Sequence, residues 1–116
     1  MTQVDLADYK NIYLATAREY IDIMSSCLAK LADNLQDTDA LKALHIASHS
    51  LRSQSQVMGY TDIASVSAMI EKNSKDILDG VSRINNGFVN FLKKSVTELN
   101  LELDKIAKGD PSLRSG

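Results

Sequence analysis

Apolar residues recur in steps of three and four along most of this chain, which is the spacing of one face of an α-helix. Interruptions divide the pattern into four long segments, and we expect helices over about residues 6–35, 37–58, 61–79 and 84–107. The positions expected to face inward are Leu14, Ala17, Ile21, Met24, Leu28, Leu31, Leu35, Leu41, Leu44, Ser48, Leu51, Ser55, Met58, Ile63, Val66, Ile70, Asn73, Ile77, Phe88, Leu92, Leu99, Leu103 and Ile106.

The residues between these segments are typical of helix ends. Residues 37–39 (Asp-Thr-Asp) supply N-cap chemistry for the second helix, and Thr61 can cap the third. Gly59 suits a left-handed C-terminal cap, Gly80 ends the third helix and Gly109 closes the fourth. Because the connections are short, consecutive helices must lie antiparallel. The pattern therefore predicts an all-α fold, an antiparallel up-down-up-down four-helix bundle.

We expect this bundle to span residues 1–108 as one domain. Residues 109–116, which include the chain's one proline, are polar and end in glycine, so we interpret them as the beginning of a linker or as residues added by cloning. The inward apolar positions of a single chain are sufficient to form the core, so the isolated domain is predicted to be a monomer.

Composition narrows the functional classes. The formal net charge is −2 and the basic residues are scattered, which argues against a nucleic-acid surface or a polybasic membrane patch. No long apolar run predicts a signal peptide or a membrane span. The single cysteine, Cys27, cannot form an internal disulfide, which is typical of a protein in a reducing compartment. We predict that Cys27 is a small buried residue of a helix. We therefore expect a soluble, cytoplasmic domain.

The second predicted helix has an unusual distribution of polar residues. Ser48 and Ser55 occupy inward positions where leucine would pack best, so this helix faces close neighbours with little side-chain volume. Another stripe, at offsets of three and four, carries His45, His49, Arg52, Ser53 and Gln56. The periodicity predicts that both imidazoles point toward solvent.

Three interpretations of the two histidines remain open at this point. Histidines four residues apart can share a metal ion, but Ile46, Ala47 and Ser48 between them include no carboxylate ligand. The histidines can also be solvated side chains without a role. The third interpretation is nucleophilic, because imidazole offers a neutral nitrogen nucleophile near neutral pH. Arg52, one turn from His49, would then offset the charge of an incoming phosphoryl group.

A sequence motif favours the third interpretation. The stretch HSLRSQSQVMG resembles the signature of histidine-containing phosphotransfer (HPt) domains, roughly His-x-Leu/Ile-Lys/Arg-Gly-x-Ser/Ala-x-x-aromatic/apolar-Gly. The positions that match in order and spacing are His49, Leu51, Arg52, Ser55, Met58 and Gly59.

The resemblance extends to the N-terminal phosphotransfer domain of chemotaxis-type histidine kinases. The stretch YLATAREYIDIMSSCLAKL, residues 13–31, is similar to their first helix, and AMIE places Glu71 where their third helix carries a glutamate. It implies that His49 is the phosphoacceptor, that Arg52 takes the place of the family's lysine and contacts the phosphate, and that Glu71 orients the imidazole by accepting a hydrogen bond from its ring.

Two positions depart from the family pattern. Ser53 replaces the glycine that normally follows the basic residue, although serine is small enough to let a partner dock. Ala68 stands where these domains often carry a second histidine that joins the hydrogen-bond network. His45 has no place in the pattern and reads as a bystander or a lesser phosphate contact.

The resemblance implies a phosphorelay intermediate of two-component signalling in chemotaxis. His49 would accept a phosphoryl group from a histidine kinase catalytic domain and pass it to an aspartate of a response-regulator receiver domain. The sequence contains no glycine-rich phosphate loop, so we expect no bound cofactor, and ATP and Mg²⁺ would come from the partners. The domain would act as a phosphocarrier, and the first-helix similarity and the tail favour a piece of a larger kinase. The alternative is a helical-bundle interaction module that kept the HPt-like fold but carries no phosphate.

Overall fold

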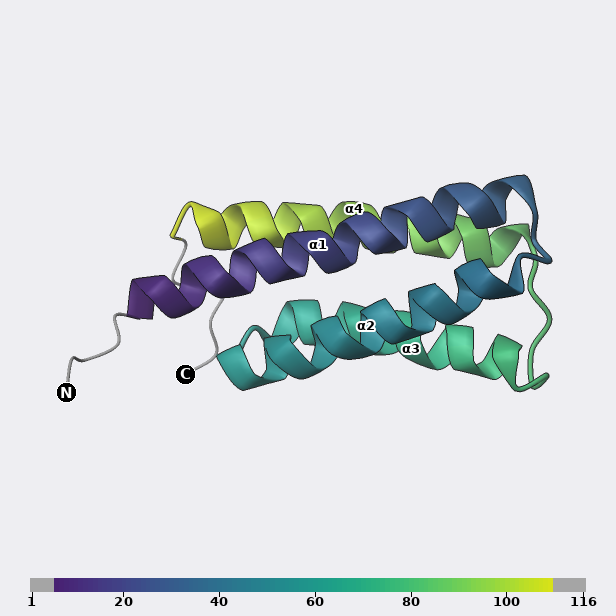
Figure 1. Cartoon of the computed structure of the whole chain (residues 1–116), viewed down its shortest axis with the longest axis horizontal. Coiled ribbons are helices and arrows are strands. Elements are labelled where there is room, and N and C mark those ends of the chain that lie inside the picture. Colours follow the sequence, from purple (N-terminus) through teal and green to yellow (C-terminus); the bar gives the residue numbers. More distant parts are fainter. Residues whose placement is uncertain (1–5, 110–116) are drawn as a thin grey trace.

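The computed structural model describes residues 6–109 and contains four helices joined by short connections (Figure 1). They are α1 (Leu6–Asp33), α2 (Thr38–Met58), α3 (Thr61–Leu78) and α4 (Asn86–Ala107). Consecutive helices run antiparallel, and the described residues include no strand. The predicted all-α four-helix bundle is confirmed, whereas the rest of the tail, from residue 110 on, lies outside the described residues.

The helices associate as two pairs. Figure 1 shows α1 beside α4 and α2 beside α3, and the contact between α2 and α3 is the most extensive in the bundle. α1 packs more extensively along α2 than along α4, whereas α3 and α4 touch least of the neighbouring helices. No helix in residues 6–109 has the length and apolar character needed to cross a bilayer.

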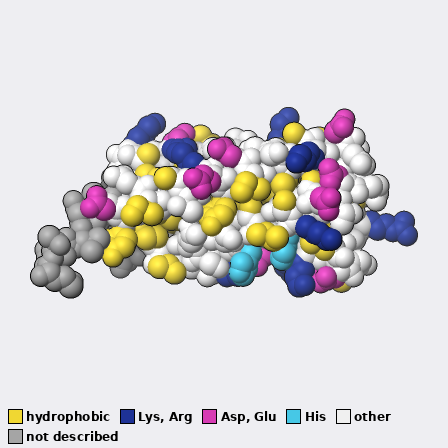
Figure 2. All heavy atoms as spheres, viewed as in Figure 1, with side chains coloured by type: hydrophobic (Ala, Val, Ile, Leu, Met, Phe, Trp, Pro, Cys, Tyr) yellow, Lys and Arg dark blue, Asp and Glu magenta, His cyan; other side chains and the backbone are white. Residues whose placement is uncertain are grey.

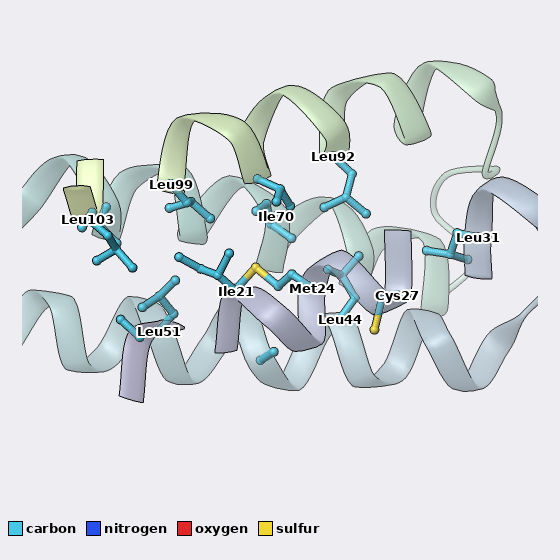
Figure 3. Packing of buried hydrophobic residues seen from close by; sticks show 14 of the residues in the cluster. Ile21, Met24, Cys27, Leu31, Leu44, Leu51, Ile70, Leu92, Leu99 and Leu103 are labelled. Carbon is cyan, nitrogen blue, oxygen red and sulfur yellow. The ribbon is translucent and has the colours of Figure 1, made fainter. Parts of the chain in front are cut away.

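Large apolar side chains from all four helices fill the centre of the bundle (Figure 3). The ones with no more than 1% of their surface exposed are Ile21, Met24, Leu31, Leu44, Leu51, Ile63, Ile70, Leu92, Leu99 and Leu103. All of these were among the predicted inward positions. Cys27 is buried as expected, and burial raises the pKa of its thiol, which keeps the thiol protonated and unreactive.

The ends of α2 follow the predicted chemistry. Asp37 is the N-cap, and its side chain accepts a hydrogen bond from the backbone N–H of Ala40 at 3.0 Å. Gly59 caps the C-terminus with φ of 79°, a left-handed conformation that a Cβ would strain.

Other helix ends differ from the prediction. Tyr60, not Thr61, occupies the N-cap position of α3, and Thr61 is the first helical residue. The physical reason is burial, because the Tyr60 ring is 5% exposed and packs on the Tyr13 ring at a centroid distance of 4.9 Å. α4 begins at Asn86 rather than near residue 84, because the Asn85 side chain accepts from the backbone N–H of Phe88. α1 ends at Asp33, two residues earlier than expected.

The inner face of α3 also differs. Asn73, predicted to face inward, is only half-buried, and the fully buried polar positions are Ser67 and Ser74. The serines on α2 that were predicted to face inward, Ser48 and Ser55, are also fully buried. Both partners of the most extensive helix contact therefore carry small side chains at buried positions, which is compatible with a close approach of the two backbones.

These buried hydroxyls have hydrogen-bond partners, with one exception. Ser48 Oγ donates to the carbonyl of His45 at 3.0 Å, and Ser74 Oγ donates to the carbonyl of Ile70 at 2.7 Å. Ser55 Oγ shares a 2.7 Å hydrogen bond with the Tyr13 hydroxyl of α1. Ser67 Oγ is the one buried side-chain oxygen in the described part of the chain without a hydrogen-bond partner.

Candidate functional site

Polar side chains from α2 and α3 converge on one residue, Glu71 of α3. His49 and Arg52, one turn apart on α2, both contact its carboxylate. The Glu71 side chain is 18% exposed, whereas that of His49 is 56% exposed. Figure 2 shows the histidine side chains at the molecular surface, with acidic and basic side chains beside them. The site therefore has a sheltered acid and an accessible imidazole.

The contact between His49 and Glu71 fixes the state of the ring. His49 Nδ1 lies 2.6 Å from Glu71 Oε2. A carboxylate oxygen at this distance accepts a hydrogen bond, so Nδ1 carries the proton and donates it. In the neutral ring the lone pair is then on Nε2, which is the nitrogen that can act as a nucleophile. The predicted hydrogen bond between the His49 ring and Glu71 is present.

Arg52 holds the same carboxylate from the other side. Its Nε donates to Glu71 Oε1, and its Nη2 lies 3.5 Å from Oε2. Nη1 donates to Gln56 Oε1 at 3.1 Å, which fixes the far end of the guanidinium. The Arg52 side chain is 25% exposed, so part of it remains accessible to solvent.

The carboxylate of Glu71 and the positive charge of Arg52 stabilise each other's ionised form. Burial alone would raise the pKa of Glu71, but hydrogen bonds and positive charge from Arg52 and His49 outweigh it, so the pKa lies below its ordinary value. The hydrogen bond to Glu71, together with its charge, raises the pKa of Arg52. Glu71 is therefore ionised at neutral pH.

The guanidinium also reaches the imidazole. Arg52 Nη2 lies 3.2 Å from His49 Nδ1. Since Nδ1 already donates to Glu71, both atoms are donors, and the shared carboxylate is what holds them together. The three side chains form one compact unit in which a cation lies beside the ring.

His45 does not lie where the sequence predicted. Its side chain was expected to point into solvent, but the residue is half-buried and its Nδ1 lies 3.2 Å from the main-chain carbonyl of Glu71. The Ser74 hydroxyl is 3.4 Å from the same nitrogen. The periodicity missed this contact because α3 approaches α2 closely enough to cover part of the stripe. Ala68, the position of the family's second histidine, is half-buried and brings no polar group.

Apolar surface adjoins the site. Ile46, between the two histidines, is 65% exposed, and Val57, near the end of α2, is 87% exposed. Val57 lines a groove of about 300 Å³ between α1 and α2, together with Tyr9, Ile12, Tyr13, Thr16, Ser53, Gln54 and Met58. The sequence pattern did not predict this groove, because Tyr9 and Ile12 are not among the predicted inward positions.

The site residues match acid–base and nucleophilic chemistry better than metal binding. No group of three or more histidine, cysteine, aspartate or glutamate side chains within residues 6–109 could hold a metal ion. The acidic member, Glu71, is already engaged by Arg52 and His49. What the arrangement offers is an oriented imidazole with an accessible ring and a neighbouring cation.

Comparison with known proteins agrees with this fold. No protein-family model matches the chain. Chemotaxis protein CheA of Bacillus subtilis is 22% identical over 111 residues, which are 96% of this chain but only 16% of that protein. The CheA phosphotransferase domain of Thermotoga maritima superposes with a TM-score of 0.84 at 18% identity, over 90% of this chain and 99% of that domain. The chain therefore has the helical-bundle fold of a CheA phosphotransferase domain, and the resemblance predicted from its sequence is confirmed.

Proposed function

We propose that this chain is a histidine phosphotransfer domain of a two-component chemotaxis system and that His49 is its phosphoacceptor. The roles of Glu71 as the residue that orients the imidazole and of Arg52 as the phosphate contact are part of this proposal. The fold and the CheA relatives support the general role, and the geometry around His49 supports the assignment of the residues.

One observation carries the proposal, the short hydrogen bond between His49 and Glu71 on a ring that is more than half exposed. A buried structural histidine would lack this exposure, and a surface histidine without a role would not need an ionised carboxylate to orient it. A phosphoacceptor needs both features, because the ring must be oriented and a partner must reach it.

The chemistry follows from the tautomer. Nε2 attacks the γ-phosphorus of ATP held by the kinase, an N–P bond forms, and the bond to the bridging oxygen breaks so that ADP leaves. The ring keeps its Nδ1 proton and becomes positively charged, and the Glu71 carboxylate stabilises that charge. Arg52 lies beside the ring and is partly exposed, so its positive charge offsets the negative charge of the incoming phosphoryl group.

The same phosphoryl group would then pass to a receiver domain. A carboxylate oxygen of the receiver's aspartate attacks phosphorus, the N–P bond breaks, and the electron pair returns to Nε2. ATP and Mg²⁺ are supplied by the partners in this scheme, and the domain works as a monomer in the cytoplasm. The chain spans about 16% of the curated relative that it matches, so its partners are proposed for the domain alone.

Incubation with a chemotaxis-type kinase catalytic domain, ATP and Mg²⁺, followed by addition of a receiver domain, tests this function. We expect mass spectrometry to show one phosphoryl group on the chain, lost when the receiver is added. Arg18→Gln, at an exposed ion pair with Asp104 remote from His49 in sequence, is a control that should behave as wild type. A chain that stays unlabelled with several such kinases would instead be an interaction module with this fold.

A further inference from the structure

His45 has no role in the function proposed above, yet it is not free. It lies one turn before His49 on α2, and its Nδ1 is 3.2 Å from the Glu71 carbonyl oxygen. A carbonyl oxygen can only accept, so Nδ1 of His45 carries a hydrogen and donates it across the interface to α3. This is a direct link from α2 to the main chain of the residue that holds His49.

Ser74 reinforces this orientation of the ring. Its hydroxyl has a single hydrogen, and two main-chain carbonyls compete for it, those of Ile70 at 2.7 Å and Glu71 at 3.0 Å. The hydroxyl oxygen, 3.4 Å from His45 Nδ1, can therefore only accept from the imidazole. Both α3 groups that face His45 Nδ1 are acceptors, which fixes the tautomer of the half-buried ring.

Glu71 is consequently attached to α2 at two points. Arg52 and His49 hold its carboxylate, and His45 holds its carbonyl. Three of the five residues in the polar stripe of α2, at successive offsets of four and three, thus converge on one α3 residue.

Around His45, side-chain packing alone specifies only weakly how α3 is positioned along α2. Ser48 of α2 and Ser67 and Ser74 of α3 are all fully buried and small, and the Ser74 hydroxyl lies 3.4 Å from His45 Nδ1 across the two helices. Helices fix their relative position when ridges of large side chains fit into grooves, and small residues make shallow ridges. A directional hydrogen bond from His45 supplies the register that these serines do not.

We propose that His45 is a positioning residue for phosphoryl transfer at His49. Its Nδ1–H holds the Glu71 turn of α3 against α2, so that the Glu71 carboxylate reaches Nδ1 of His49. This inference rests on the proposed function for its consequence, but its structural part can be measured without any phosphoryl transfer.

Two substitutions separate the hydrogen bond from the volume of the ring. His45→Leu removes the donor and keeps an apolar side chain of moderate size, whereas His45→Asn places an amide N–H near the position of Nδ1. Phosphoramidate, a small phosphoryl donor, replaces the kinase, so partner docking does not enter the result. The rate of phosphorylation and the His49 tautomer, read by ¹⁵N NMR of the imidazole, are measured for both variants.

We expect His45→Leu to react about five-fold more slowly, the loss that corresponds to one ordinary hydrogen bond, and His45→Asn to recover most of the rate. The Nδ1–H tautomer of His49 should lose population in His45→Leu and regain it in His45→Asn. Since His45 acts through Glu71, adding His45→Leu to Glu71→Ala should slow the reaction no further.

Other results would overturn the inference. An unchanged rate and tautomer in His45→Leu would show that His45 is a bystander, and equal defects in both variants would show that only the shape of the ring matters. If wild type takes no phosphate but its His49 tautomer responds to His45→Leu as expected, the proposed function fails and the positioning contact stands. Thermal unfolding of each variant shows whether a lost signal comes from a lost fold, in which case His45→Asn alone decides.

Discussion

The two helix pairs of this bundle are built differently. α1 and α4 face the core with large apolar side chains such as Ile21, Met24, Leu99 and Leu103. α2 and α3 contribute leucines and isoleucines to the same core, but each also carries two fully buried serines, and their mutual contact is the most extensive in the bundle. Large side chains stabilise the packing of the first pair, whereas small side chains in the second pair allow the two backbones to lie close together.

The difference explains where the site is. A carboxylate on α3 can reach an imidazole on α2 only if the helices approach closely, and serine permits that approach where leucine would not. The 2.6 Å contact of His49 with Glu71 and the 3.2 Å contact of His45 with the Glu71 carbonyl both cross this interface. We therefore expect substitutions in the first pair to change mainly stability, and substitutions between α2 and α3 to change the site.

The largest effect on stability is expected in the apolar pair. Leu99→Ala removes a fully buried side chain and leaves a cavity, so the free energy of unfolding should fall by about 2–5 kcal/mol. Urea unfolding measures it. The His49 tautomer should be unchanged below the unfolding transition, and a changed tautomer would show that the two pairs are not independent.

The Tyr13 hydroxyl, which joins α1 to Ser55 of α2, predicts a loss of stability at alkaline pH. Burial raises the pKa of Tyr13 from 10.0 to about 12, although its hydrogen bond to Ser55 opposes this. The folded state thus keeps the proton that the unfolded chain releases, so this contribution is complete below pH 10 and is lost as pH rises toward 12. The loss should reach about 3 kcal/mol.

Tyr13→Phe is the matched variant for that test. It lacks the ionisable group, so its free energy of unfolding should fall less steeply between pH 10 and 12 than that of wild type. Equal slopes in the two proteins would mean that Tyr13 does not titrate with the unfolding transition.

Refilling the serine interface should damage the site as well as the fold. Ser48→Leu forces extra volume between α2 and α3, and overpacking of this kind costs about 1–3 kcal/mol. We also expect the enlarged gap to weaken the His49–Glu71 contact, seen as a smaller Nδ1–H population in ¹⁵N NMR. Ser48→Ala, which keeps the volume small, is the control and should leave the His49 tautomer as in wild type.

The smallest effect on stability is expected at the ion pair itself, where the rate carries the signal. Glu71→Gln keeps an oxygen that accepts from Nδ1–H but removes the charge that stabilises the attacking ring. Orienting groups of this kind contribute about 10²–10⁴ in rate, and we expect a loss at the lower end or less, because the kinase supplies most of the electrostatics. A phosphorylation rate equal to that of wild type would make Glu71 an ordinary surface residue.

Acid titration adds a test of the same residue. Because the pKa of Glu71 is lowered by folding, its contribution to stability is present above the unfolded pKa of 4.5 and is lost as pH falls through the lower folded value. Glu71→Gln should lack this component, so unfolding curves of the two proteins should converge in acid. Parallel curves would contradict the lowered pKa.

The sequence predicts the fold well because its signals are local. Helical periodicity identified every large apolar side chain with no more than 1% of its surface exposed, although it missed Tyr13, Tyr60 and Val96 at the edge of the core. Asp37 and Gly59 marked the ends of α2 through chemistry of their own. The predicted start of α3 was wrong because it depends on the packing of Tyr60 against Tyr13, a contact between distant residues that no local pattern contains.

The site was predictable only in part for a similar reason. His49 and Arg52 are one turn apart, so their proximity follows from helix geometry, and Glu71 came from the family resemblance rather than from periodicity. The contact of His45 with the Glu71 carbonyl depends on how closely α3 approaches α2. The buried polar residues on the inner face of α3 are Ser67 and Ser74, whereas the predicted inward residue was Asn73. A face of buried serines on both helices is the signal that would have indicated it.

Site mapping after phosphorylation by a chemotaxis-type kinase domain and ATP tests the central claim most directly. The account predicts one acid-labile, alkali-stable phosphoryl group on His49, absent in His49→Gln and retained to most of its final extent in His45→Gln. Phosphate found on His45, or labelling that survives His49→Gln, would contradict it.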